Sequence, residues 1–262
     1  MNRVGIDIGS TTVKIAIIDE QNKILFSAYE RHYANIQETL RGIIERAYEQ
    51  LGDQAIAPMI TGSGGLTISE HLNIPFVQEV VSVATALKDF APQTDVAIEL
   101  GGEDAKIIYF TGGIEQRMNG ICAGGTGSFI DQMATLLKMG ADEMDQAAQM
   151  AEKTYTIASR CGVFAKSDIQ PILNQGGRKE DVAASIFQAV VDQTVAGLTQ
   201  GRELKGKIVF LGGPLHFLMG LRQRFVETLK LDGEHAVFPA DGDCFAGIGA
   251  ALCASDSVSY TH

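Results

Sequence analysis

The sequence has no run of five or six basic residues and no excess of positive charge. Its 262 residues carry a formal net charge of -11 at neutral pH. A protein that binds nucleic acid must neutralise phosphates with clustered Lys and Arg side chains. This class of function is therefore excluded, and a small soluble ligand or a protein partner is expected instead.

A long hydrophobic run is also missing. Apolar stretches are short and broken by Gly, Asp or Glu, which argues against a membrane span. Residues 1–3 lead directly into an apolar strand pattern, without the succession of basic, apolar and small residues that marks a signal peptide. We therefore expect a cytoplasmic protein without membrane association. Its 45% hydrophobic and 20% charged residues are typical of a globular chain.

Several motifs of nucleotide-binding and metal-binding proteins are absent. There is no Walker pattern G-x-x-x-x-G-K-[ST], which excludes a P-loop, and no strand–GxGxxG–helix arrangement of a dinucleotide fold. The cysteines form no CxxC pair, and in a cytoplasmic chain of this length they are not a disulfide framework. They are Cys122, Cys161, Cys244 and Cys253.

A short pattern of a strand, an acidic residue, a glycine turn and a returning strand occurs twice. The first copy is Val4–Ser10 (VGIDIGS) and the second is Val96–Gly102 (VAIELGG). With the same offset, Lys14 on the first returning strand aligns with Lys106 on the second. Both copies carry the same chemical parts, which predicts two related lobes.

Hydrophobic periodicity and turn residues predict an α/β chain. The first lobe is expected over residues 1–95 and the second over 96–262, with the C-terminal helix either in the second lobe or packed back toward the first. Strands are expected at 4–9, 12–19, 23–29, 58–60, 207–211 and 236–238. Helices are expected at 36–51, 128–137, 181–198, 216–229 and 246–254.

The loop Asp7–Thr12 (DIGSTT) has the composition of a phosphate cradle. Gly9 lets the backbone turn and approach a ligand, while successive N–H groups can bind phosphate oxygens. Asp7 can hold the hydration shell of Mg²⁺ or orient a water, because Mg²⁺ keeps most of its waters, and Lys14 can neutralise phosphate charge. Taken alone, an ordinary hairpin explains the loop equally well. The loop hydroxyls belong to Ser10, Thr11 and Thr12.

A second loop of the same kind favours ligand binding over an ordinary hairpin. Its glycines, Gly101 and Gly102, stand among three acids. Two such loops facing each other would clasp a nucleoside triphosphate and its Mg²⁺ between the lobes. A third glycine turn, Gly212-Gly213-Pro214, suits the packing of a ribose or an adenine against bare backbone. The acids of the second loop are Glu99, Glu103 and Asp104.

Together these loops resemble the nucleotide motifs of the actin-like superfamily, which contains sugar kinases, Hsp70 chaperones and actin. Asp7–Thr12 resembles its phosphate-one motif, Glu99–Gly102 its phosphate-two motif and Gly212-Gly213 its adenosine motif. The resemblance implies an α/β fold of two duplicated ribonuclease-H-like lobes, with ATP or ADP and Mg²⁺ in the interlobe cleft. One departure is Glu99, where many members have Asp; which acid meets Mg²⁺ therefore stays open among Asp7, Glu99 and Glu103.

Two of the cysteines precede expected helices. Cys122 lies in NGICAGGTGSF and Cys161 in SRCGVFAKSD. A thiolate or an anionic iron–sulfur cluster is stabilised at a helix N-terminus. A [4Fe-4S] cluster takes four thiolates, which a twofold homodimer would supply as two from each subunit. Residue type alone favours the alternative of two small buried apolar cysteines.

The residues around these cysteines resemble one family closely. CAGGTGSFIDQMA and SRCGVFAKSDIQ are similar to the activator components of 2-hydroxyacyl-CoA dehydratases and the ATPase subunits of benzoyl-CoA reductase, the BadF/BadG/BcrA/BcrD ATPases. The resemblance implies that Cys122 and Cys161 ligate a [4Fe-4S] cluster shared across a homodimer. Cys244 and Cys253 match no ligand of the family and are expected to be packing residues. It also implies four residues near the nucleotide: Gly124, Gly125, Thr126 and Gly127.

The implied activity is an ATP-driven, one-electron reduction of a partner, either a 2-hydroxyacyl-CoA dehydratase or a related acyl-CoA reductase, in an anaerobic cell. Reduced ferredoxin or flavodoxin would supply the electron. Two alternatives remain open: a small-molecule, sugar-type kinase of the same fold, and a non-redox ATP switch of the chaperone or actin type. Neither alternative has a use for Cys122 or Cys161.

Overall fold

The computed structural model describes residues 1–119, 124–158 and 161–257 of the chain, which divide into two compact units. Unit 1 contains residues 1–93 together with those from Asp243 onward, and unit 2 contains Thr94–Gly242. For the C-terminal helix the sequence left two places open, the second lobe or the first. It is part of unit 1, so the chain returns to its first unit.

Unit 1 is built on a four-stranded mixed sheet of order β3-β2-β1-β4. β1 pairs antiparallel with β2 and parallel with β4, and β2 pairs antiparallel with β3. Ile and Val dominate β1 and β2, as expected for strands that are covered on both faces. The bounds are β1 (Asn2–Ile8), β2 (Thr12–Ile18), β3 (Ile24–Arg31) and β4 (Ile56–Thr61).

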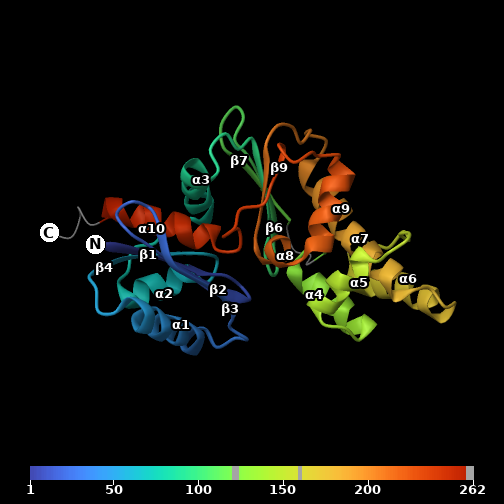
Figure 1. The fold of residues 1–262 in the computed structure, drawn as a ribbon, viewed down its shortest axis with the longest axis horizontal. Helices are drawn as coiled ribbons and strands as arrows, with labels where there is room; N and C mark the ends of the chain where they lie inside the picture. The colour runs from blue at the N-terminus through green and yellow to red at the C-terminus, as the bar shows by residue number, and fades with distance from the viewer. Residues whose placement is uncertain (120–123, 159–160, 258–262) are drawn as a thin grey trace. The chain divides into compact units, whose positions relative to one another are not determined.

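Helices cover both faces of this sheet (Figure 1). On one face Ile6 and Ile8 of β1 cluster with Ile43 of α1. On the other face β1 lies directly against α10, since a Cβ on Gly5 would come within 1.8 Å of the carbonyl oxygen of Gly247. The helices of unit 1 are α1 (Ile36–Leu51), α2 (Gly65–Leu72), α3 (Glu79–Phe90) and α10 (Phe245–Ser257).

The close approach of α10 to α3 leads to a stability prediction. A Cβ on Gly249 of α10 would lie 1.8 Å from the carbonyl oxygen of Ser82 in α3, whereas a Cβ on Gly247 would meet nothing closer than 3.5 Å. We expect Gly249→Ala to lower the free energy of unfolding by roughly 1–3 kcal/mol, as overpacking does. The free energy of unfolding of Gly247→Ala should equal or exceed that of the wild type, because Ala favours a helix. Urea unfolding followed by circular dichroism measures both, and equal stability of the two variants would contradict this packing.

Unit 2 contains a five-stranded sheet of order β7-β6-β5-β8-β9. β5 pairs antiparallel with β6 and parallel with β8, which repeats the pairing of β1 with β2 and β4. The acid and the lysine of each copy are in register, Asp7 with Lys14 and Glu99 with Lys106. The predicted duplication is therefore confirmed in the sheets. The bounds are β5 (Val96–Leu100), β6 (Ala105–Tyr109), β7 (Glu115–Met118), β8 (Ile208–Leu211) and β9 (Ala236–Val237).

The helices of unit 2 share one hydrophobic core with its sheet. α7 contributes many of the buried residues, including Phe187 and Val190. Its 21 residues are long and apolar enough to cross a membrane by length and composition, but 67% of the apolar window is buried, as in the core helix of a globular protein. The bounds are α4 (Gly127–Leu137), α5 (Ala141–Gln149), α6 (Gly162–Asn174), α7 (Lys179–Thr199), α8 (Gly213–Phe217) and α9 (Met219–Leu229).

The prediction of a single helix at 216–229 is wrong in detail, because the structure has two helices in this region. α8 starts at Gly213, with Pro214 in its first turn, and Leu218 separates it from α9 with extended dihedral angles, φ -100° and ψ 99°. Proline is well accommodated in a first helical turn, where its missing N–H is not needed. α2, α3, α5 and β7 were not expected from the sequence.

Candidate nucleotide and metal site

The first candidate loop joins β1 to β2 and is closed by a hydrogen bond of 2.9 Å from the Gly9 N–H to the Thr12 carbonyl. Gly9 does not have a positive φ, so the turn itself does not require glycine. A Cβ at Gly9 would come within 3.6 Å of the Lys14 Nζ and 3.7 Å of the Thr12 hydroxyl. These are ordinary van der Waals distances, and glycine leaves the space beside both groups open. Ser10 in the same loop is exposed.

Asp7 lies at the end of β1 and is almost completely buried (1% exposed). Its Oδ2 accepts a hydrogen bond of 2.7 Å from the Lys14 Nζ. Among the residues that the structure describes, none pairs with the other oxygen, Oδ1. A buried polar atom needs a partner, and a water of hydrated Mg²⁺ would provide one. The residues present therefore fit a hydrated Mg²⁺ beside Asp7.

Two residues that sequence reasoning missed support this loop, and both depend on the placement of β3. His32 Nδ1 accepts a hydrogen bond of 3.0 Å from the Ala34 N–H, which assigns the ring proton to Nε2. Nε2 then donates to the Gly9 carbonyl at 3.2 Å. The Tyr29 ring lies 5.9 Å from the Lys14 Nζ. Burial raises the pKa of Tyr29 although Lys14 acts in the opposite direction, so this phenol stays neutral beside the lysine.

The second candidate loop joins β5 to β6. A hydrogen bond of 2.8 Å from the Gly101 N–H to the Asp104 carbonyl closes it. A Cβ on Gly101 would lie 2.1 Å from the Asp104 Oδ1, so a larger residue at this position would displace the Asp104 carboxylate. Lys106 is buried and is shared by two acids, with its Nζ 2.9 Å from the Asp104 Oδ2 and 3.9 Å from the Glu99 Oε2. Glu103 is exposed in the loop.

The start of α4 is attached to this second loop. The Gly127 N–H donates to the Gly101 carbonyl at 3.0 Å, and the Ser128 N–H donates to the Gly102 carbonyl at 2.7 Å. A Cβ on Gly127 would come within 3.2 Å of the Gly101 oxygen and 3.3 Å of a ring carbon of Pro214. Three motifs that are far apart in the sequence therefore meet at Gly127: the second loop, the glycine-rich segment and the expected adenosine turn.

The expected adenosine turn lies against the end of β5. Gly212 has a positive φ of 91°, and a Cβ there would lie 2.1 Å from the carbonyl oxygen of Leu100. Only glycine fits such a position. In the glycine-rich segment, Gly125 also has a positive φ, 81°, and Thr126, directly before α4, is fully buried. Gly124 and Gly213 are buried as well.

Of the two expected cluster ligands, the structure describes one. Cys161 is half-buried and directly precedes α6 as its N-cap residue. A Cβ on the following residue, Gly162, would come within 2.8 Å of the Gln132 Oε1 of α4, so the start of α6 lies beside α4. A thiolate fits this position, since free N–H groups at a helix N-terminus stabilise negative charge. Cys122 lies outside the described residues.

Within the described part of the chain, no group of three or more His, Cys, Asp or Glu side chains is arranged to hold a metal ion. Cys244 is buried, with its Sγ 3.6 Å from the Ala28 carbonyl. The Cys253 Sγ lies 3.7 Å from the Thr85 hydroxyl. These positions agree with the packing role expected for both.

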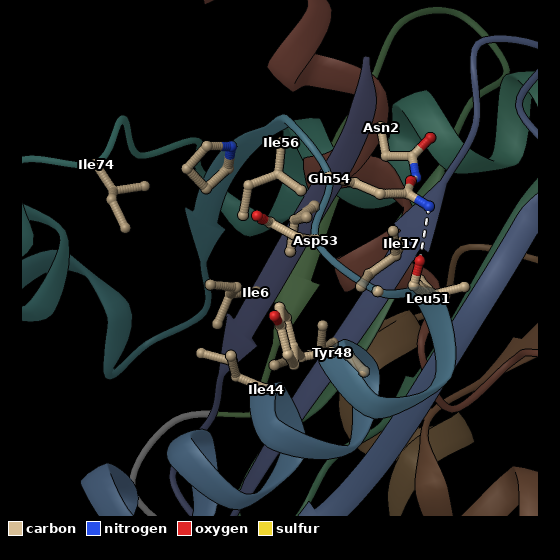
Figure 2. A pocket seen from close by; sticks show the side chains of 15 residues that line it. Asn2, Ile6, Ile17, Ile44, Tyr48, Leu51, Asp53, Gln54, Ile56 and Ile74 are labelled. Atoms are coloured by element: carbon tan, nitrogen blue, oxygen red, sulfur yellow. Dashed lines mark hydrogen bonds between the residues drawn. The ribbon is translucent and has the colours of Figure 1, made fainter.

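A cavity of about 350 Å³ in unit 1 does not belong to this site. Figure 2 shows its lining side chains, among them Ile6, Ile17 and, from α1, Ile44. Side chains alternate between the two faces of a strand, so Ile6 and Asp7 point to opposite faces of the sheet. The cavity lies on the α1 face and its lining is mostly apolar, whereas Asp7 shares the α10 face with Gly5.

Comparison with known proteins gives a consistent result. The family model described as BadF/BadG/BcrA/BcrD ATPase family matches residues 4–254. An uncharacterized protein of Methanocaldococcus jannaschii is 28% identical over 96% of this chain, which spans only 62% of that protein's length. The activator of lactoyl-CoA dehydratase from Anaerotignum propionicum is 29% identical, over 98% of both chains.

Two solved structures share the fold. Component A of (R)-2-hydroxyglutaryl-CoA dehydratase from Acidaminococcus fermentans matches with a TM-score of 0.89 and 25% identity, over 99% of both chains. The activator of 2-hydroxyisocaproyl-CoA dehydratase from Clostridium difficile, solved with bound ADPNP, matches with a TM-score of 0.87 and 24% identity, over 99% of this chain and 96% of the other. The expected actin-like ATPase fold is confirmed.

Proposed function

Since the chain belongs to the BadF/BadG/BcrA/BcrD ATPase family, we propose that it is an ATP-dependent activator that passes one electron at a time to an acyl-CoA dehydratase or reductase. Relatives whose names describe dehydratase activators support the partner class. The ADPNP bound in one structural relative supports ATP as the nucleotide. A cytoplasmic location follows as part of the proposal.

In this proposal each unit contributes a loop to nucleotide binding. Asp7 Oδ1 holds a water near the terminal phosphate, and Lys14 neutralises phosphate charge from the adjacent strand. In unit 2 the backbone at Gly101 and Gly102 approaches the phosphates, with Glu99 or Glu103 as further acids for Mg²⁺. The adenosine part is assigned to Gly212 and Gly213. The reaction is the hydrolysis of ATP by water to ADP and inorganic phosphate.

Cys122 and Cys161 are the proposed ligands of a [4Fe-4S] cluster, together with the same two cysteines of a second copy of the chain. Bound in this way, the cluster would supply a carrier for single electrons, taken from reduced ferredoxin or flavodoxin. The half-buried thiol of Cys161 at the start of α6 supports this assignment.

The observation that carries the proposal is the connection through α4. Its first turn is hydrogen-bonded to the second phosphate loop, through the N–H groups of Gly127 and Ser128. Further along the same helix, Gln132 lies against the residue that follows Cys161. A change in the loop on ATP hydrolysis would thus reach the proposed cluster ligand through one rigid helix. Such coupling requires that nucleotide bind two arrangements of the protein with different affinity.

The release of inorganic phosphate from ATP, measured under anaerobic conditions with and without added hexoses and amino sugars, tests the proposed activity. We expect phosphate release that needs Mg²⁺ and no sugar, because water is the proposed acceptor. Transfer of phosphate to a sugar, with no release in its absence, would identify a kinase instead and contradict the proposal.

A further inference from the structure

Thr61, at the end of β4, has a buried hydroxyl without a partner. Its side chain is fully buried (0% exposed), and no described residue forms a hydrogen bond with its Oγ1. The same holds for the Oδ1 of Asp7. Thr61 and Asp7 are in register on the parallel strands β4 and β1. Residues in register on neighbouring strands point to the same face of the sheet, so both unpaired oxygens face the same space.

The fold does not require a hydroxyl at this position, as the second copy of the repeat demonstrates. In unit 2 the equivalent strand is β8, and the residue in register with Glu99 is Leu211. Leu211 is buried and apolar. A buried hydroxyl without a partner is destabilising by about 1–3 kcal/mol, so packing alone would favour an apolar residue in unit 1 as well. Thr61 therefore points to a polar ligand.

The loop that follows Thr61 is pressed against the same carboxylate. Gly62 has a positive φ of 92°. A Cβ on Gly62 would lie 2.3 Å from the Asp7 Oδ1 and 2.5 Å from the Ile8 carbonyl oxygen. The Gly64 N–H donates to that carbonyl at 2.8 Å, which fixes the loop to the end of β1. The expected adenosine turn of unit 2 follows its strand in the same way, with a glycine whose φ is 91°.

We propose that the Thr61 hydroxyl and the Asp7 carboxylate together hold one water of the hydrated Mg²⁺ that accompanies ATP. This inference rests on the proposed ATPase activity and adds a residue to its site. Mg²⁺ in nucleotide sites keeps several waters, and protein groups hold the ion partly through them. A metal-bound water has two hydrogens to donate. If the water donates one hydrogen to the Asp7 Oδ1 and the other to the Thr61 Oγ1, both buried oxygens gain a hydrogen-bond partner.

Two substitutions at this position separate the hydroxyl from the shape of the side chain. Thr61→Val keeps the branched shape and removes the hydroxyl, whereas Thr61→Ser keeps the hydroxyl. We expect Thr61→Val to raise the Mg²⁺ concentration that gives half-maximal ATP hydrolysis by about 10-fold, the equivalent of one hydrogen bond to a charged group. The Mg²⁺ dependence of Thr61→Ser should stay close to that of the wild type. A Thr61→Val variant with wild-type Mg²⁺ dependence would overturn the inference.

A thermal melt provides a readout that does not depend on catalysis. Without nucleotide, Thr61→Val should melt at the wild-type temperature or above it, because the unpaired hydroxyl is gone. With ADP present, added Mg²⁺ should raise the melting temperature less in Thr61→Val than in the wild type or in Thr61→Ser. A lower melting temperature of Thr61→Val without nucleotide would reveal a structural partner for the hydroxyl and overturn the inference.

The two proposals fail in different ways. A wild-type chain that releases no phosphate from ATP contradicts the proposed function, and the inference about Thr61 falls with it. A wild-type chain that hydrolyses ATP, beside an equally active and equally Mg²⁺-dependent Thr61→Val variant, contradicts only the assignment of Thr61.

Discussion

Asp7→Asn is expected to lower the rate of ATP hydrolysis by roughly 100-fold or more, the range found when a group that positions or activates the reacting water is lost. Asn keeps the size of the side chain but removes its negative charge. The half-buried Lys14 ammonium, 2.7 Å from Asp7 in the native chain, then loses this charged partner. The water proposed at Oδ1 loses its strongest acceptor. Phosphate release under saturating ATP and Mg²⁺ measures the effect.

Asp53→Asn is the matched control for this variant, because it makes the same change of charge at an exposed site in unit 1. It should hydrolyse ATP at the wild-type rate. A circular dichroism melt of Asp7→Asn establishes that the variant is folded, since removing one partner of a buried pair is also destabilising. If the folded Asp7→Asn protein hydrolyses ATP as fast as Asp53→Asn, Asp7 has no catalytic role.

Cys161→Ala is expected to abolish iron binding while ATP hydrolysis continues. Alanine offers no ligand for iron, and a [4Fe-4S] cluster needs all of its thiolates. The thiol makes no capping hydrogen bond to α6, so the helix should persist in the variant. Iron content of the anaerobically purified protein and phosphate release from ATP are the two measurements.

Cys253→Ala removes another thiol that is also partly exposed, on α10 of unit 1, and serves as the control. It should keep both iron and ATP hydrolysis. Equal iron content in Cys161→Ala and the wild type would refute the ligand assignment. Loss of iron from Cys253→Ala but not from Cys161→Ala would identify Cys253 on α10 as the iron ligand instead.

The sequence was informative where the signal is local. The helix at 36–51 was predicted with the bounds that α1 has, because its apolar residues recur with helical spacing and Asn35 accepts a hydrogen bond from the Glu38 N–H at its start. The repeat was also visible, since Asp7 and Glu99 each end a strand and each faces a lysine in register.

Features that depend on distant contacts could not be predicted. α3 is held against α10 by two contacts. The Ser82 hydroxyl donates a hydrogen bond to the Ala246 carbonyl. The Ser82 carbonyl oxygen lies only 1.8 Å from the position that a Cβ on Gly249 would take. Nothing local to residues 79–90 reveals this partner. The assignment of the C-terminal helix to unit 1 has the same origin, in the close approach of Gly5 and Gly247.

Thr61 illustrates the same limit within the candidate site. Its segment, TGSGG, could be recognised as a glycine-rich turn after a strand. Its relation to Asp7 depends on the parallel pairing of β4 with β1, which no local pattern encodes. His32 was missed for a similar reason, since only the β2–β3 pairing brings it to the Gly9 carbonyl.

The anaerobic visible absorption spectrum, recorded with an iron count before and after the addition of ATP and Mg²⁺, tests the central claim most directly. We expect a brown protein with about four irons per dimer, and a spectrum of the reduced protein that changes when ATP is added. A colourless protein without iron that still hydrolyses ATP would contradict it and identify an ATP switch without a redox role.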